Sequence, residues 1–467
     1  MNALAKDISR LLPRNQVFYQ PEELMTYRSD ATHYLASRIP DLLVFPETTQ
    51  DISALLKYAF AREIPVVPRG AGSGLAGGST PVKGGIVVDM KRMKKIIEID
   101  KDNLTAKVES GVVLAQFQET VEKMGLFYPP DPQSMSVCTL GGNVATRAGG
   151  PRGVKYGTTG NYLLGLETVL SDGTVIKTGG KVMKQSAGYD ITHLMCGSEG
   201  TLGIISQITL RLLTLPPATR TLIVGCKTLD EGAKIVSEII ARGNLPAKLE
   251  LVMAGAVKAM NMYINPPLPV DVAAYLFIEL DGIEAQVTME AKSIYDLCKE
   301  METAEIRVIT DKKEESVYWT ARKNLYPLGY LKNKRIIVED VTVPRNRIPE
   351  LVREIQNISK SLDIELGCSG HAGDGNLHPT IRMQQLSEEL DQKAYEAIKL
   401  IVKKGLELEG TISGEHGIGI HKSEFLSWDL GEEQVELMKR IKYAFDPKGI
   451  MNPGKIWIWG DGNHDKA

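Results

Sequence analysis

The chain has 467 residues, which is too long for one ordinary hydrophobic core, so we expect two or three domains. Lys and Arg number 55 and Asp and Glu 58, a net charge of −3, and neither sign forms a long run, which argues against a nucleic-acid partner. Apolar residues make up 43% and charged residues 24%, as in an ordinary folded globular protein, which argues against disorder.

The first residues mix acidic and basic side chains and lack the apolar core of a signal peptide. No apolar run reaches about 18 residues, so the sequence predicts no transmembrane helix and a cytoplasmic protein. The cysteines stand singly, and their spacing fits neither a disulfide framework nor a zinc or iron–sulfur motif. We interpret these five residues as reduced thiols, most of them buried: Cys138, Cys196, Cys226, Cys298 and Cys368.

Residues 1–37 are predicted to form an N-terminal helical segment, with Pro21 at a helix start. From residue 38 onward the pattern becomes strand, helix, strand, with the helix beginning near Thr49, which indicates an α/β unit. Further strands follow, many separated by glycine turns. The break at residues 215–221 predicts a domain boundary. We therefore assign 38–217 to one domain.

Residues 218–420 are predicted to form a second domain, because strands alternate there with amphipathic helices. That alternation indicates a sheet with helices on one face. The final segment, 421–467, is partly irregular and proline-rich, and we expect it to return to the first domain. The fold class predicted from these patterns is α+β.

The loop "PRGAGSGLAGG", residues 68–78, contains a formal GxGxxG match after an apolar strand. A nicotinamide-binding Rossmann loop needs a helix that starts within the glycines. Residues 75–85 hold four glycines and Pro81, so no helix is expected there. The loop could still hold a diphosphate through its backbone N–H groups, although a flexible surface loop is the alternative. Residues 139–163 and 196–206 form two more loops of small residues.

The stretch "CSGHAGDGNLHPTI" is interpreted as a strand, a turn and a second strand that bring His371 and His378 to one point. Two imidazoles on adjoining strands suit a divalent cation of the zinc or iron class, whereas a single histidine would more often only form hydrogen bonds in the core. A third ligand is expected, and "SGEHGIG" offers Glu415 beside His416. Asn376 would support the site from the turn.

The motifs "GAGSGLAGG", "CTLGGNVATRAGG", "GSEGTLGIIS", "GHAGDGNLH", "SGEHGIG" and "NPGKI" occur here in the order typical of one flavoprotein family. The chain resembles, over almost its whole length, the FAD-linked 2-hydroxyacid dehydrogenases of the vanillyl-alcohol-oxidase type, which include D-lactate dehydrogenases and the D subunit of glycolate oxidase. The resemblance implies a two-subdomain FAD-binding domain, an antiparallel-sheet substrate (cap) domain and a C-terminal return to the flavin.

By motif, the resemblance implies a set of FAD contacts: Arg69, Gly70, Ala71, Gly72, Ser73, Gly74, Leu75, Ser136, Thr139, Gly142, Asn143, Ala145, Glu199, Gly203, Ile205 and Asn452. Relatives that bind FAD covalently through the first loop carry a histidine where this sequence has Ser73, so the FAD is expected to be non-covalent. The resemblance also matches His371, His378 and Glu415 to the metal ligands and His416 to the catalytic base.

Arg322 lies where the family carries the arginine that binds the substrate carboxylate, and a surface arginine on a helix is the alternative. Relatives that act on larger dicarboxylates place a lysine two residues before the "ED" pair, whereas this chain has Val338 before "EDVTVP". A small monocarboxylate such as lactate or glycolate is therefore favoured over 2-hydroxyglutarate, while Lys334 and Arg335 leave the larger acid open. The expected reaction removes the hydroxyl proton with a histidine and passes hydride to the flavin, yielding a 2-keto acid.

Three functions are compatible with this sequence. The favoured one is a metal-assisted FAD dehydrogenase of D-2-hydroxy acids, first of all D-lactate, with an acceptor protein of the electron-transfer-flavoprotein type. The alternatives are a glycolate oxidase-type subunit with an iron–sulfur partner, and an FAD alcohol oxidase that uses oxygen and no metal. A non-catalytic flavin-binding subunit would leave the histidine motifs unexplained. The choice of metal and acid, and a homo-oligomeric state, stay open.

Overall fold

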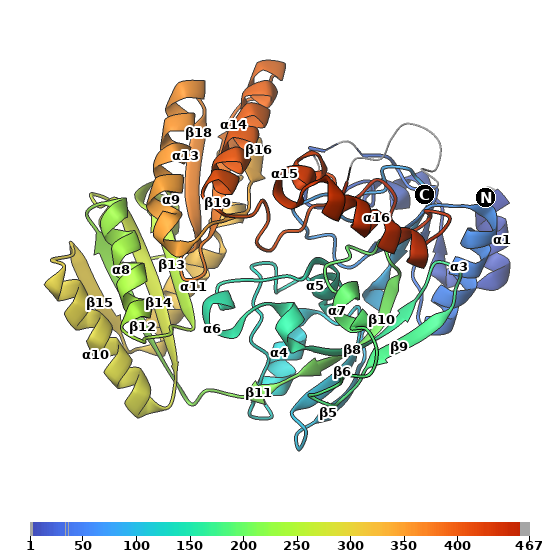
Figure 1. The fold of residues 1–467 in the computed structure, drawn as a ribbon, viewed down its shortest axis with the longest axis horizontal. Coiled ribbons are helices and arrows are strands. Elements are labelled where there is room, and N and C mark those ends of the chain that lie inside the picture. Colours follow the sequence, from blue (N-terminus) through green and yellow to red (C-terminus); the bar gives the residue numbers. More distant parts are fainter. Residues whose placement is uncertain (1–2, 33, 36, 458–467) are drawn as a thin grey trace. The chain divides into compact units, whose positions relative to one another are not determined.

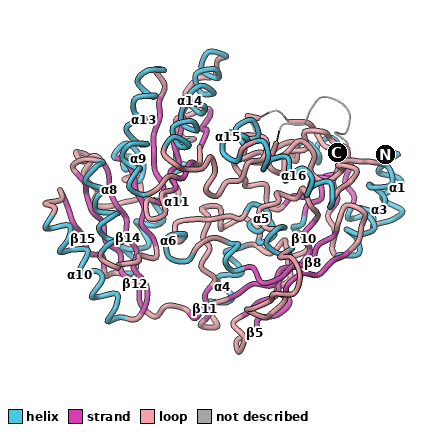
Figure 2. Tube along the Cα trace, viewed as in Figure 1, coloured by secondary structure: helices cyan, strands magenta, loops and turns pink. Residues whose placement is uncertain are grey.

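The structure is a computed structural model that describes residues 3–32, 34–35 and 37–457 (Figures 1 and 2). It comprises two compact units. Unit 1 consists of Met1–Ala148, Thr158–Leu215 and Glu415–Ala467, and unit 2 of Gly149–Gly157 and Pro216–Gly414. Among the described residues, no helix combines the length and the apolar character needed to cross a membrane.

Unit 1 contains a four-stranded sheet in the order β1 (Val17–Phe18), β2 (Leu42–Val44), β4 (Ile86–Asp89), β3 (Val66–Arg69). β2, β4 and β3 run parallel, and β1 is antiparallel to β2. Short, continuous apolar runs of this kind are typical of parallel strands buried on both faces. The helices α1 (Ala3–Leu11) and α3 (Thr49–Arg62) share one apolar core with this sheet, so the predicted α/β unit is present.

A second sheet of unit 1 is antiparallel, in the order β5 (Ile96–Asp100), β6 (Thr105–Glu109), β10 (Ile204–Arg211), β8 (Leu163–Val169), β9 (Val175–Gly179). A short pair, β7 (Leu126–Phe127) and β11 (Leu213–Thr214), lies apart from it. The remaining α-helices of unit 1 are α2 (Pro21–Met25), α4 (Leu114–Glu122), α5 (Leu140–Thr146), α7 (Ile191–Met195), α15 (Leu426–Leu430) and α16 (Glu432–Phe445).

The C-terminal segment is anchored in unit 1 by a buried lysine. The Lys442 ammonium donates to the carbonyl oxygens of Thr201 and Met451, at 2.7 and 2.8 Å, and pairs with Asp446 at 2.5 Å. Met451 also forms a parallel bridge with Val66 at the end of β3. These contacts bring the residues around Asn452 next to the strand that leads into the first glycine loop.

Unit 2 is built on an antiparallel sheet in the order β15 (Glu305–Ile309), β12 (Ala218–Cys226), β14 (Ala274–Gly282), β13 (Lys248–Met253), β18 (Glu365–His371), β19 (Asn376–Met383), β16 (Arg335–Val338), and β17 (Val341–Thr342) also pairs with β19. One face is covered by a row of four helices, α10 (Glu284–Glu300), α8 (Leu229–Ala241), α13 (Ile348–Leu362) and α14 (Glu388–Glu407), as Figure 1 shows.

The prediction of helices on one face is incomplete, because the opposite face is covered as well. Side chains alternate between the faces of a strand, and Val252, Tyr275 and Phe277 share an apolar cluster with α9 (Ala254–Met260) and α11 (Lys312–Lys323). The short α12 (Leu325–Gly329) follows α11. Glu250 lies two residues before Val252 and therefore faces α9 and α11 too. This is the face that carries the candidate site.

The segment 149–157 differs from the sequence assignment, which placed it in the FAD-binding domain. It contains α6 (Gly153–Tyr156) and belongs to unit 2 because its polar side chains reach the central strand β14. The Lys155 ammonium contacts Asp281 Oδ1 at 2.5 Å, and the Tyr156 hydroxyl donates to Asp281 Oδ2 at 2.8 Å. The N-terminal segment also contributes a strand, β1, to the first sheet in addition to its helices.

Candidate functional site

The predicted strand, turn and strand are present in unit 2. β18 ends at His371, residues 372–375 form the turn, and β19 begins at Asn376. Gly375 has φ +84°, and a Cβ atom there would collide with the carbonyl oxygen of Val343. Only glycine meets both conditions without strain. The glycine-rich sequence of the turn therefore has a local structural cause.

The hairpin places the two imidazoles on one face of the sheet. His378 lies opposite Ser369 in the register of β18 and β19, so it is the diagonal neighbour of His371. Both side chains are buried, with 2% and 6% exposure. Their Nε2 atoms lie 3.3 Å apart, and the ring planes are nearly perpendicular at 81°.

The outer nitrogens of both rings face groups that can only accept a hydrogen bond. Nδ1 of His371 lies 2.5 Å from Oε1 of Glu250, and Nδ1 of His378 lies 3.3 Å from the backbone carbonyl of Glu339. Each neutral ring therefore carries its proton on Nδ1 and its lone pair on Nε2. Two lone pairs that face each other at 3.3 Å repel, so the arrangement favours a positive charge between them, either a proton or a metal ion.

A divalent metal fits this geometry. Imidazole nitrogens bind zinc-class ions at about 2.1 Å. Two such nitrogens that share one ion at an angle of about 90–110° are roughly 3.0–3.4 Å apart, by simple trigonometry from that bond length. The 3.3 Å between the two Nε2 atoms falls in this range. In metal-binding histidines, the ring nitrogen that does not bind the metal usually donates a hydrogen bond that orients the ring, and the Nδ1 contacts described above have this form.

Glu250 is a site residue that the motif analysis missed. Its side chain is fully buried, and its second oxygen, Oε2, lies 2.7 Å from the guanidinium of Arg322 on α11. Burial alone would raise the pKa of Glu250, but the neighbouring His371 and Arg322 hold it below the ordinary value. The only signal in the sequence is an acidic residue in the middle of "KLELVM", an otherwise largely apolar strand.

Arg322 is buried at 3% exposure, so it is not the surface arginine of the alternative interpretation. One terminal nitrogen pairs with Glu250, a contact that the sequence did not predict. The Nε atom of Arg322 is buried and has no hydrogen-bond partner within the described residues. An unsatisfied buried donor is costly, which makes this N–H available for an anionic group.

Glu415 and His416 begin the last segment of unit 1, whereas His371 and His378 lie in unit 2. The chain leaves unit 2 at Gly414, where a Cβ atom would collide with the side chains of Thr342 and Asn376. Consecutive Cα atoms are about 3.8 Å apart, so the Cα atom of Glu415 lies at this distance from that of Gly414 whatever the placement of unit 1. Chain connectivity thus keeps Glu415 near Asn376, the register partner of His371.

The first glycine loop of unit 1 contains no helix between Gly70 and Gly85, as predicted. Gly70 packs so closely on the start of α5 that a Cβ atom would collide with the Thr139 hydroxyl. The side chain of Arg69 lies beneath Gly72 and donates to the carbonyl oxygen of Ser29 at 2.8 Å. The first loop is therefore in contact with the start of α5, a helix within the stretch 139–163 that was predicted as a loop, and Arg69 packs against the first loop at Gly72.

Asn452 connects the first and third loops. Its side-chain amide donates to the carbonyl oxygens of Gly78, at 2.8 Å, and Glu199, at 2.6 Å. Both oxygens of the Glu199 carboxylate accept from backbone, one from the N–H of Ile418 and one from the N–H of Gly419, each at 2.8 Å. Glu199 thus holds the C-terminal segment in place, a role that the motif comparison did not predict.

The other predicted FAD contacts lie on the same loops or on the elements next to them. Thr139 caps α5 by accepting from the N–H of Gly142, and Ile205 lies on β10. Ser136 lies in an exposed turn before α5. The remaining predicted residues are placed in the first loop (Ala71, Ser73, Gly74, Leu75), on α5 (Asn143, Ala145) and just before β10 (Gly203).

Several buried polar atoms of unit 1 fit a large polar ligand. Oδ1 of Asn452, Oγ of Ser198 and Oγ of Ser110 are buried without a hydrogen-bond partner among the described residues. Such atoms are rare in folded proteins and indicate an absent partner such as a ligand or water. Two of them border the loops predicted to hold FAD, so the residues present fit a dinucleotide.

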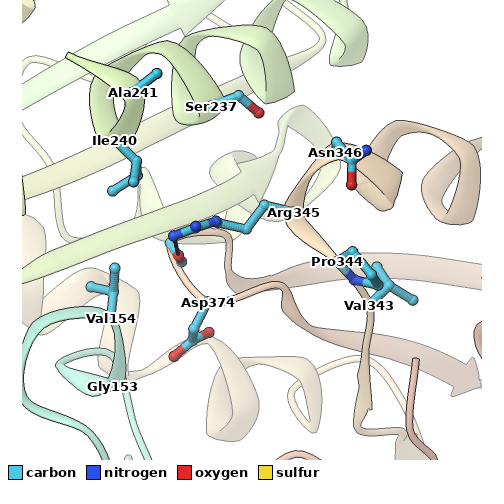
Figure 3. Close-up of a pocket in the computed structure, with 11 residues that line it drawn as sticks. Gly153, Val154, Ser237, Ile240, Ala241, Val343, Pro344, Arg345, Asn346 and Asp374 are labelled. Atoms are coloured by element: carbon cyan, nitrogen blue, oxygen red, sulfur yellow. Dashed lines mark hydrogen bonds between the residues drawn. The ribbon is translucent and has the colours of Figure 1, made fainter. Parts of the chain in front are cut away.

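A groove of about 710 Å³ in unit 2 touches the turn between β18 and β19 but is a separate feature (Figure 3). It is lined by Gly373 and Asp374 of the turn, by Val154, and by residues of α8 and 343–346. The Arg345 guanidinium reaches the turn and donates to the carbonyl oxygen of Gly373 at 3.3 Å. Neither His371 nor His378 lines this groove, so it is not the candidate catalytic site.

Both parts of the chain match known families. Residues 40–179 match the FAD binding domain, and residues 215–456 match the C-terminal domain of FAD linked oxidases. The glycolate oxidase subunit GlcD of Bacillus subtilis (strain 168) is 41% identical over 434 residues, covering 93% of this chain and 92% of its own. The D-lactate dehydrogenase of Archaeoglobus fulgidus is 37% identical over 439 residues, covering 92% of this chain and 95% of its own.

Solved structures show the same fold at low identity. p-Cresol methylhydroxylase with substrate bound superposes with a TM-score of 0.80 at 17% identity, covering 97% of this chain and 96% of that one. This likeness shows the predicted vanillyl-alcohol-oxidase fold alone. Together with the family matches and the two relatives, it shows that the chain belongs to the FAD-linked oxidases, as an oxidoreductase of the GlcD and D-lactate dehydrogenase type.

Proposed function

We propose that this protein is an FAD- and metal-dependent dehydrogenase that oxidises a small D-2-hydroxy acid, first of all D-lactate to pyruvate. The observation that carries the proposal is the pair of Nε2 atoms of His371 and His378, which face each other at 3.3 Å while the Nδ1 atoms face acceptor groups. A divalent ion held there would supply Lewis-acid stabilisation to the negative charge that develops on the substrate hydroxyl oxygen.

The residues of this chain have distinct roles in the proposed reaction. His371, His378 and Glu415 hold the ion. Arg322 donates its buried Nε–H to the substrate carboxylate while its terminal nitrogen stays paired with Glu250. This contact positions the α-carbon of the acid.

His416 is the proposed base. A neutral imidazole takes the hydroxyl proton as the α-hydrogen leaves, and this proton transfer makes the hydride departure feasible near neutral pH. FAD, when bound, accepts that hydride, so the acid loses two electrons and two hydrogens and becomes the 2-keto acid. The segments around Asn452, Glu199 and Thr139 would hold the FAD, and Ser73 offers no imidazole for a covalent histidyl link.

Glycolate is the second candidate substrate, supported by the 41% identity to the glycolate oxidase subunit GlcD. The two acids differ only by the methyl group on the carbon that carries the hydroxyl. A hydrophobic contact with one methyl group changes selectivity by roughly 10- to 200-fold. Relatives that act on dicarboxylates carry a lysine shortly before the "ED" pair. This chain has Val338 before that pair, which favours either of these small acids over 2-hydroxyglutarate.

The electrons leave the reduced flavin for a separate protein in this proposal. An acceptor of the electron-transfer-flavoprotein type is the first choice, with an iron–sulfur subunit as the alternative. Reduced enzyme, mixed anaerobically with such a flavoprotein, a soluble quinone or oxygen, distinguishes these routes. Fast reoxidation by oxygen, with none by the flavoprotein, would make the protein an oxidase.

The test of the catalytic proposal is an anaerobic screen in which loss of visible flavin absorbance reports reduction. D-lactate, L-lactate, glycolate and D-2-hydroxyglutarate are compared on the protein as purified and after treatment with a chelator. We expect reduction by D-lactate or glycolate, its loss after chelation, and its return with zinc, manganese or iron(II). Undiminished reduction in the metal-free protein would reject the metal-dependent mechanism.

A further inference from the structure

Glu250 contacts both the proposed metal ligand His371 and the buried Arg322. It lies on β13 directly opposite His371 in the register of β18, and its side chain has no exposed surface. Oε1 is 2.5 Å from Nδ1 of His371, and Oε2 is 2.7 Å from a terminal nitrogen of Arg322. One carboxylate therefore joins a guanidinium to an imidazole in a continuous buried chain.

An ion pair between Glu250 and Arg322 would not by itself explain this arrangement. Buried ion pairs contribute little net stability, because desolvation of both charges offsets their attraction. Glu279 in the same unit serves for comparison, because it is also buried and lies on the same face of the sheet. It pairs with Lys248 at 2.7 Å and with Arg152 at 3.7 Å. Glu279 has no histidine within these contacts, whereas Glu250 directs its other oxygen at the ring nitrogen of His371.

We infer that Glu250 is a positioning residue for the metal: it fixes the proton of His371 on Nδ1, orients the ring, and increases the donor strength of Nε2. Arg322 keeps the Glu250 carboxylate aligned from the opposite side. Carboxylates that accept from the outer nitrogen of a metal-binding histidine act in this way, and their loss typically lowers metal affinity by 10- to 100-fold. The inference rests on the proposed function, because it requires a metal at His371 and His378.

The test is metal retention by the full-length flavoprotein, measured by competition with a chelator and, after cobalt(II) substitution, by the visible spectrum of the bound ion. Glu250→Gln keeps the shape of the side chain but removes its charge. We expect the chelator concentration that removes half of the metal to fall by 10- to 100-fold, the cobalt spectrum to change, and the FAD content to stay at that of the wild type. Glu250→Asp retains the charge and should recover part of the affinity.

Glu279→Gln is the matched control, since it also removes a buried carboxylate from the same sheet face. It should retain the metal affinity and cobalt spectrum of the wild type, even if its thermal stability falls. If Glu250→Gln folds poorly because Arg322 is left uncompensated, Glu250→Gln/Arg322→Met removes both charges and provides the same measurement.

The outcomes separate the inference from the function on which it rests. If the wild type binds no divalent metal, the proposed function fails and the role of Glu250 fails with it. If the wild type binds metal and Glu250→Gln behaves like Glu279→Gln, only the positioning role is overturned. A selective loss of affinity in Glu250→Gln, partly restored in Glu250→Asp, supports it.

Discussion

The side-chain amide of Asn452 donates to the carbonyl oxygen of Glu199 at 2.6 Å, across 253 positions of the chain. The same amide donates to Gly78, so one residue holds two loops that the sequence assigns to FAD. Asn452 adopts a left-handed conformation with φ +44°, which asparagine tolerates better than most residues. Its Oδ1 atom is buried without a hydrogen-bond partner among the described residues and is available to the flavin.

Asn452→Asp should weaken FAD binding by at least about tenfold, because it removes both donated hydrogen bonds and buries a charge, a loss of about 1–3 kcal/mol or more. The measurement is the FAD dissociation constant from flavin fluorescence. Asn261→Asp is the control, since Asn261 bridges a loop of unit 2 in a similar way, through the backbone of Leu268. Equal FAD affinity in Asn452→Asp and the wild type would contradict the role of Asn452.

His378→Ala should abolish metal binding and lower turnover by at least about 100-fold, the scale of a lost general acid–base or Lewis-acid contribution. FAD content should stay unchanged, because all of the individually predicted FAD contacts lie in unit 1. Glu415→Gln should behave alike. Elemental analysis measures the metal content and the flavin spectrum measures the FAD content. The control is His193→Ala, which changes an exposed histidine. Metal retained at full occupancy in His378→Ala would remove this residue from the ligand set.

The hairpin was predictable because its causes are local: the glycine turn and both histidines lie within residues 371–378, and the strand pattern lies directly on either side of the turn. Glu250 was not, because it reaches His371 from another strand, 121 positions away, through sheet register. The second covered face of the unit 2 sheet was missed for the same reason. Short amphipathic helices such as α9 and α11 do not reveal on which side of a sheet they pack. The membership of 149–157 depends on contacts with Asp281 that no local pattern encodes.

Arg322→Lys should raise the KM for the acid about tenfold or more, because an ammonium cannot present the fixed geometry of a guanidinium to both Glu250 and a substrate carboxylate. Steady-state kinetics with D-lactate and glycolate provide the measurement, together with metal content. An unchanged KM with weaker metal binding would show that Arg322 serves Glu250 alone. If neither quantity changes, Arg322 has no part in the site.

The five cysteines should be unreactive in the native protein, since all of them are buried. Burial raises the pKa of Cys196 to about 11 and that of Cys298 to about 12, so few thiolates exist at pH 8. Native protein should therefore react slowly with a thiol reagent at pH 8, and the unfolded protein should titrate five thiols. Rapid modification of one thiol in the native state would identify a locally open segment.

His416→Ala should separate proton transfer from metal binding. The Nε2 atom of His416 lies 3.9 Å from the carboxylate of Glu415, beyond hydrogen-bond distance, so the two neighbours can have different tasks. Loss of a general base slows the chemical step by roughly 10²–10⁴-fold, and we expect flavin reduction in anaerobic stopped-flow experiments to slow by this factor while metal and FAD remain bound. His421→Ala, five residues later on the same segment, is the control and should reduce at the rate of the wild type. Metal loss in His416→Ala would instead make His416 a ligand, and reduction at the wild-type rate would show that another group takes the proton.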